Sequence, residues 1–146
     1  MRRVIFAGMS LESNESLGPR SKLIFEHTAL GSFVAEGDLW TSTVSDGGKN
    51  LELSLAGNES GPSEALITAA SALLQRISEV QKIALNFLTS QEEAPGREDF
   101  ICQGLELLRE DYPEHFSLSF VLFGDDGGVW RVEFEDGAPL FLTRDD

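Results

Sequence analysis

The hydrophobic residues divide the chain into three regions that differ in spacing. Between residues 22 and 56 they form short runs, and Leu51, Leu53 and Leu55 alternate with polar positions. A period of two is typical of a strand with one buried and one solvated face. We therefore expect short strands in this region and one before it, at Val4–Ala7, Leu23–Phe25, Leu30–Val34, Leu39–Val44 and Leu51–Leu55.

The second region predicts a long helix from about Pro62 to Ser90. Its apolar residues recur at spacings of four and three, the repeat of one helical face. Pro62 suits the first helical position, and Glu64 brings a negative charge to the first turn. A coiled coil would need a narrower seam, so we expect the helix to lie across a sheet. The repeating positions are Leu66, Ala70, Leu73, Ile77, Val80, Ala84 and Phe87.

A second, shorter helix is predicted from Glu98 to Tyr112. Pro113 ends it, because the residue before a proline avoids helical angles. At helical spacing one face carries Phe100, Ile101, Leu105, Leu108 and Tyr112.

The third region returns to alternation. The segments 116–122 and 130–134 alternate apolar and polar residues on either side of a Gly- and Asp-rich turn, which predicts a hairpin. Asp136 and Gly137 mark a further turn before a short strand at Leu140–Leu142.

Strands, then helices, then strands indicate an α+β fold. We expect a mostly antiparallel sheet with one long and one shorter helix packed on one face. Residues 20–146 form one domain in this interpretation, and residues 1–19 form a flexible N-terminal arm that ends at a Gly-Pro turn.

The charge balance limits the possible partners. The 146 residues contain 25 acidic and 11 basic side chains, for a formal net charge of -14. This charge repels a phosphate backbone, so we expect no nucleic-acid binding. It would speed the encounter with a basic protein, although it would also serve solubility alone.

The lone Cys102 can form no intramolecular disulfide, which fits a reducing compartment. The apolar run Val4–Ala7 is too short for a signal peptide, and no run is long enough to span a membrane. We therefore expect a cytoplasmic protein with no membrane association.

No pattern points to catalysis, a cofactor or a metal. His27 and His115 are far apart and have no partner at metal-ligand spacing. The turns 45–48 and 125–128 lack the offsets of a calcium loop and are interpreted as hairpin turns. Carboxylates gather near the chain end, and we take them as the candidate partner-binding residues: Asp125, Asp126, Glu133, Glu135 and Asp136.

The order of motifs resembles an uncharacterised bacterial domain family. The resemblance covers about residues 22–142 and rests on Leu30–Phe33, Trp40–Val44, Gly47–Gly48, Leu51–Leu55, Gly128–Gly137 and Leu140–Phe141. It implies a β-meander, two helical segments and a closing hairpin. Family members often end in Gly-His, where this chain has Leu142-Thr143. The family has no assigned activity, but some members resemble immunity proteins encoded beside toxins.

Three hypotheses for function follow. The first is a non-catalytic, acidic protein-binding domain, immunity-like in one form, that neutralises a basic partner. The second is a small-molecule binder or enzyme with a site between helix and sheet, where Trp40, Trp130 and the phenylalanines could line a cavity. The third is a homo-oligomeric structural subunit. We favour the first, and the sequence leaves the oligomeric state open.

Overall fold

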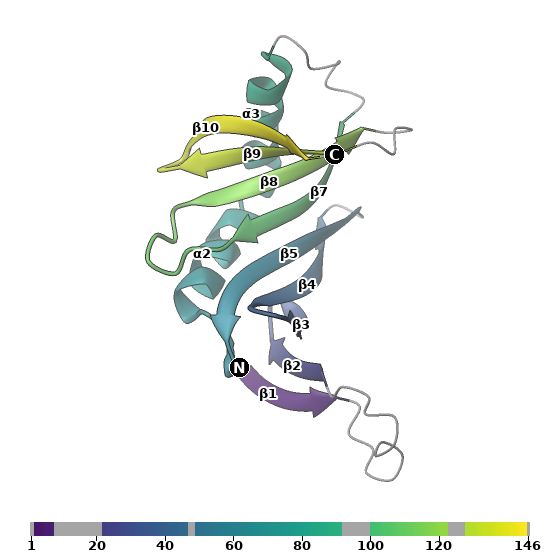
Figure 1. Ribbon diagram of the computed structural model, residues 1–146, viewed down its shortest axis with the longest axis vertical. Coiled ribbons are helices and arrows are strands. Elements are labelled where there is room, and N and C mark those ends of the chain that lie inside the picture. The colour runs from purple at the N-terminus through teal and green to yellow at the C-terminus, as the bar shows by residue number, and fades with distance from the viewer. Residues whose placement is uncertain (1, 8–21, 47–48, 92–99, 123–127, 146) are drawn as a thin grey trace.

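The computed structural model describes residues 2–7, 22–46, 49–91, 100–122 and 128–145. These residues form a strongly curled open sheet and two helices (Figure 1). The sheet order is β1-β2-β3-β4-β5-β7-β8-β9-β10, and short β6 pairs with the end of β5. The strands are β1 (Arg2–Ala7), β2 (Lys22–His27), β3 (Gly31–Glu36), β4 (Leu39–Asp46), β5 (Lys49–Asn58), β6 (Gly61–Pro62), β7 (Phe100–Leu107), β8 (Phe116–Leu122), β9 (Val129–Glu135) and β10 (Ala138–Asp145).

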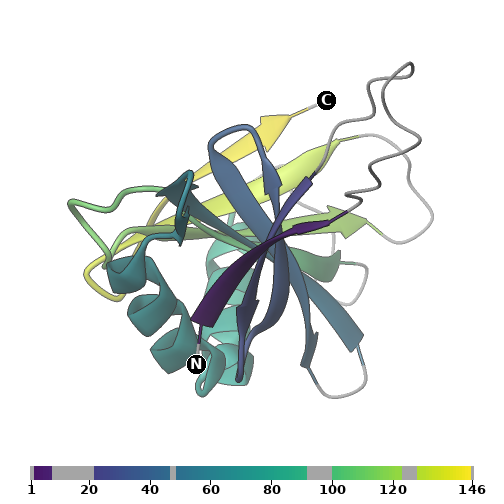
Figure 2. The same cartoon turned by 90° about the horizontal axis from the view of Figure 1, so that it is seen from below.

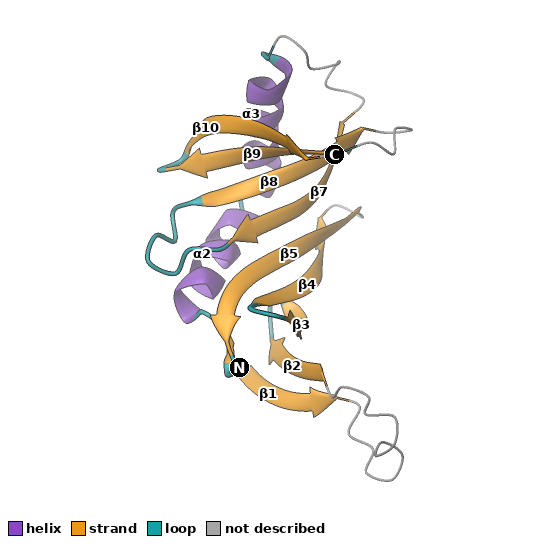
Figure 3. Ribbon diagram, viewed as in Figure 1, coloured by secondary structure: helices purple, strands orange, loops and turns teal. Residues whose placement is uncertain are grey.

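The predicted α+β class and mostly antiparallel sheet are confirmed. All neighbouring strands of the described sheet pair antiparallel except β5 and β7, which pair in parallel. The helices lie in the connection between these two strands (Figure 3). A parallel pair requires such a crossover, because the chain must return to the same end of the sheet.

The prediction of a single helix from Pro62 to Ser90 is wrong in its continuity, because this segment forms two helices. Helix α2 spans Glu64–Leu74 and helix α3 spans Ile77–Thr89. Ser63 caps α2 by accepting a hydrogen bond from the Leu66 amide, so Pro62 lies before the helix. At the break, the Gln75 and Arg76 amides bond three residues back, to Ala72 and Leu73. This tightening ends α2 without a glycine or proline, so the residue types at the break do not predict it.

The prediction of a shorter helix from Glu98 to Tyr112 is also wrong, because residues Phe100–Leu107 form strand β7. A β-bulge between Cys102 and Gly104 shifts the pairing with β8 by one residue. The inward residues are consequently Phe100 on one side of the bulge and Leu105 and Leu107 on the other. A bulge breaks the period of two, and the resulting spacing resembles that of a helix.

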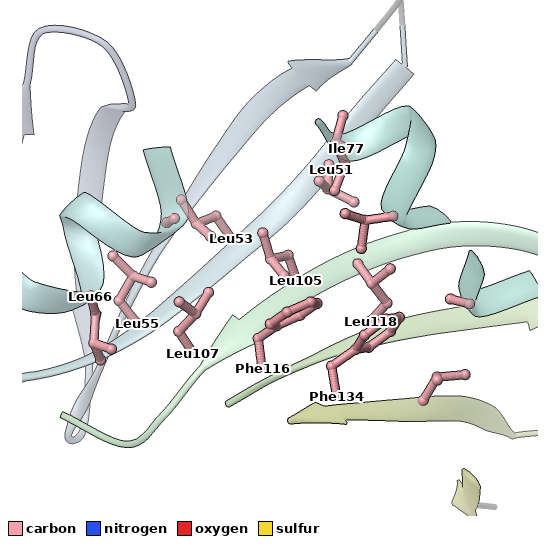
Figure 4. Close-up of a cluster of buried hydrophobic side chains, with 14 of the residues drawn as sticks. Leu51, Leu53, Leu55, Leu66, Ile77, Leu105, Leu107, Phe116, Leu118 and Phe134 are labelled. Carbon is pink, nitrogen blue, oxygen red and sulfur yellow. The ribbon is translucent and has the colours of Figure 1, made fainter. Parts of the chain in front are cut away.

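The core lies between one face of the sheet and the two helices. Leu53 and Leu55 of β5 lie beside Leu105 and Leu107 of β7, and all four are fully buried. Figure 4 shows these leucines beside Leu66 of α2 and Ile77 of α3. The same cluster includes Phe33, Trp40, Ala70, Val80, Ala84, Leu88, Leu118, Phe120, Val132 and Phe134.

The opposite face of the sheet is polar but covered at its centre. Ser54, Ser117 and Ser119 alternate with core residues, and each is buried. A Cβ at Gly104 would lie 2.8 Å from Ser119 Oγ, so this region admits only small residues. The solvated face predicted for the strand Leu51–Leu55 is therefore covered at Ser54, which is 7% exposed.

The first strand extends beyond the sequence-based expectation. The predicted strand Val4–Ala7 lies within β1, which pairs with β2 so that Val4 opposes Phe25. Residues 8–21 lie outside the described residues, so the flexibility predicted for residues 1–19 stays a prediction. The predicted turn glycines Gly47 and Gly48 also lie outside them.

Replacing Leu105 and Leu108 separately by alanine tests the strand at 100–107. Leu105 is fully buried, whereas Leu108 is 45% exposed. We expect Leu105→Ala to lower the free energy of unfolding by about 2–5 kcal/mol, because it leaves a cavity in the core. Leu108→Ala should change it by less than about 0.5 kcal/mol. The measurement is urea denaturation, and equal large losses would instead support the predicted helix, which buries both leucines.

Candidate functional site

A charged network crosses the helix-free face of the sheet over β7, β8, β9 and β10. Arg131 Nε lies 3.4 Å from Glu106 Oε1, and Arg131 also pairs with Asp145. The Ser117 hydroxyl lies 3.4 Å from the same Glu106 oxygen. These side chains come from neighbouring strands in register, because Ser119 opposes Arg131 and Ser117 opposes Glu106. Arg131 therefore pairs with two carboxylates, and the network of Glu106, Arg131 and Asp145 keeps one negative charge.

His115 joins this face at the start of β8. Its Nε2 lies 3.1 Å from Glu133 Oε1, and each side chain is 19% exposed. Glu133 lies on the polar face as the alternation predicts, but it is mostly covered and faces His115 instead of open solvent. His27 has a different role, because its Nδ1 accepts hydrogen bonds from the amides of Ala29 and Leu30 and closes the β2–β3 turn.

The end of the β9–β10 hairpin carries a cluster of carboxylates around one tyrosine. The Tyr112 hydroxyl donates a hydrogen bond of 3.0 Å to Asp136 Oδ2. This bond raises the pKa of Tyr112, and the negative charges of Asp136, Glu135 and Glu114 add to the rise. In the described part of the chain, no basic side chain pairs with Glu135 or Asp136.

A neighbouring ion pair orders the loop that carries the tyrosine. Arg109 donates a hydrogen bond to Asp111 at 3.2 Å, which lowers the pKa of the Asp111 carboxyl. The Arg109 guanidinium also lies 5.5 Å from the centre of the Tyr112 ring. The hydrogen bond from Tyr112 to Asp136 in turn connects the β7–β8 loop to the hairpin.

Two large apolar side chains lie exposed next to these carboxylates. Leu140 is 51% exposed and Phe141 is 46% exposed. Both belong to β10, the last strand of the sheet order, and Phe141 opposes Glu133 of β9. We call the set Tyr112, Glu114, Glu135, Asp136, Leu140 and Phe141 the hairpin-end surface.

A separate groove of about 560 Å³ opens where the α2–α3 break faces the β2–β3 turn and the end of β4. Figure 2 shows the turn between β2 and β3 beside the helices. No lining residue is ionisable. The groove is lined by Ala29, Leu30, Gly31, Thr43, Val44, Ser45, Ser71, Leu74, Gln75 and Ile77.

The structure brings together part of the predicted site. Glu135 and Asp136 lie on the hairpin-end surface, and Glu133 lies next to it beneath His115. Asp125 and Asp126 lie outside the described residues. Sequence reasoning missed the contribution of Tyr112, Leu140 and Phe141, because it placed Tyr112 on the apolar face of a predicted helix and the other two in a short strand.

The described residues contain no group of three or more His, Cys, Asp or Glu side chains that could hold a metal ion. Trp40, proposed as a cavity residue, is buried in the core and donates its indole hydrogen bond to the Asn58 carbonyl. No described helix is long and apolar enough to cross a membrane.

Comparison with protein-family models, curated proteins and solved structures finds no match for this chain. The resemblance to an uncharacterised bacterial family therefore stays a prediction, and the function must be argued from the surfaces described above.

Titration of Tyr112 tests the geometry of the hairpin end, because this residue is the single tyrosine of the chain. We expect Asp136→Asn to lower its pKa, since the variant loses both the carboxylate acceptor and one negative charge. Glu135→Gln should lower it less, because Glu135 acts through its charge alone. The measurement is the ultraviolet absorbance of tyrosinate against pH. Identical midpoints in all three proteins would contradict the hydrogen bond.

The sign of the effect on stability follows from the raised pKa. The folded state holds the phenolic proton more tightly than the unfolded chain, whose tyrosine titrates near pH 10. The contribution of Tyr112 is therefore complete below about pH 10 and is lost as the pH rises through the raised pKa. Asp136→Asn should reduce this loss in thermal unfolding measured across the same range.

Proposed function

We propose that this protein is a non-catalytic, acidic protein-binding domain that acts in the cytoplasm and recognises a basic protein through its hairpin-end surface. The observation that carries the proposal is the position of Glu135 and Asp136, which have no basic partner in the described part of the chain, beside exposed apolar side chains.

Each part of the surface matches a known requirement of protein recognition. Aromatic and large apolar residues supply most of the affinity at interface centres. Surrounding charges of one sign select the partner and speed its approach. Leu140 and Phe141 would provide the apolar contact, and Glu135 and Asp136 would pair with lysine or arginine of the partner.

The single cysteine and the net charge of -14 are compatible with this role. The charge disfavours nucleic acid as the partner, because the phosphate backbone would be repelled. An immunity protein that neutralises a basic toxin is one form of the proposal, and it depends on the family resemblance.

A homo-oligomer formed through β10 is the second candidate. Its support is the position of β10 at the end of the sheet order, since an unpaired edge can add a strand from another chain. Pro139 and the irregular pairing between Pro139 and Phe141 oppose it, because both features interrupt a regular edge. Sedimentation at high concentration separates the candidates, and a stable dimer would favour this one.

Capture of partners from a native lysate at low salt tests the first candidate. The variant Glu135→Gln/Asp136→Asn removes two charges from the hairpin end, and asparagine tolerates the positive φ of 53° at position 136. We expect the unaltered protein to retain basic proteins and the variant to lose them. The control Glu36→Gln/Asp38→Asn removes the same charge from the exposed β3–β4 turn and should retain them.

The apolar contact is tested with the partner recovered in this way. Phe141→Ala should weaken its binding by about 30-fold, the effect of losing roughly 2 kcal/mol at an interface centre. Ile101→Ala is the matched control, because Ile101 is also an exposed strand residue. Recovery of no basic protein, or equal losses for both charge variants, would contradict the proposal.

A further inference from the structure

The groove at the α2–α3 break contains an unpaired stretch of strand edge. Strand β3 pairs with β4 only from Val34 to Glu36, opposite Thr41 to Leu39. Beyond Thr41 the two strands separate, while β4 continues to pair with β5 as far as Asp46. The edge of β4 that faces away from β5 therefore has no partner strand from Ser42 onward in the described part of the chain.

The inner end of this gap is closed by a side chain. The Ser42 hydroxyl donates a hydrogen bond of 2.8 Å to the Leu30 carbonyl. This side-chain contact takes the place of the next backbone hydrogen bonds between β3 and β4. Outward from it, the groove runs along Thr43, Val44 and Ser45.

The exposed edge offers hydrogen-bonding groups in the repeat of a β-strand. Along an antiparallel strand, alternate residues direct both the N–H and the C=O to the same side. Within residues 42–45, every second residue therefore presents both groups toward the groove. An extended peptide carries the complementary repeat, and addition to a free edge is an established mode of peptide recognition.

The side chains of the groove define the kind of peptide. Leu30, Val44, Leu74 and Ile77 provide an apolar floor, and no lining residue carries a charge. A charged side chain placed here would lose water without gaining an ion pair, which costs free energy. Four lining residues have polar side chains that form no hydrogen bond within the described residues: Thr43, Ser45, Ser71 and Gln75.

We propose that this groove binds an extended peptide segment with uncharged side chains, which adds as a short strand to the free edge of β4. The volume of about 560 Å³ lies within the ordinary range of ligand sites, roughly 300–1,000 Å³. The groove is distinct from the hairpin-end surface and shares no residue with it.

The test is selection of a random peptide library on the intact protein, followed by affinity measurement for the enriched peptides. Gln75→Trp fills the groove from an exposed position, so it should weaken binding by at least about tenfold without affecting folding. Lys82→Trp is its control, because Lys82 is exposed on α3 and does not line the groove. Ser71→Leu and its control Thr68→Leu repeat the comparison on α2.

Methylation of alternate peptide amides provides a readout for strand addition. We expect one of the two methylated series to lose binding, because it removes the donors that face β4. Enrichment of no peptide, or equal affinities for Gln75→Trp and Lys82→Trp, would overturn the proposal. Peptides that respond only to Glu135→Gln/Asp136→Asn would also overturn it, while leaving the hairpin-end surface as the binding site.

Discussion

The parallel pairing of β5 with β7 joins the two halves of this sheet. The strands before it and the strands after it each form an antiparallel series, and neither has a complete core of its own. At the seam, Leu53 lies beside Leu105 and Leu55 beside Leu107, all without exposed surface. Each such leucine contributes roughly 1.5–3 kcal/mol of burial, provided that the helices cover the seam.

The helical crossover follows from the same pairing. A parallel neighbour cannot be reached by a tight turn, so the chain between β5 and β7 must return across the sheet. The buried faces of α2 and α3 meet the strand leucines there. The break at Gln75 and Arg76 separates the helices and forms one wall of the groove.

The two faces of the sheet have different consequences for recognition. On the helix-free face, Glu106 and Asp145 both pair with Arg131. The negative charge of these two carboxylates is therefore partly compensated within the protein. At the hairpin end, the neutral Tyr112 hydroxyl donates a hydrogen bond to Asp136. This bond leaves the negative charge of Asp136 uncompensated. The carboxylates of the hairpin end therefore have less charge compensation in the described residues than Glu106 and Asp145 have.

Elements whose residues keep a regular period could be predicted from the sequence. The strand at Leu51–Leu55 and the hairpin of β8 and β9 follow from alternation, and the helical region follows from its repeat of four and three. The acidic character of the hairpin end could likewise be predicted, because composition and turn residues depend on local sequence alone.

The remaining features depend on tertiary contacts. The bulge at Cys102–Gly104 shifts the alternation of β7 by one residue, so local spacing suggested a helix where strand pairing prevails. The exposure of Leu140 and Phe141 depends on β10 having no outer neighbour in the described sheet, and the groove depends on β3 leaving β4. These features arise from contacts between segments far apart in the chain, which no local pattern records.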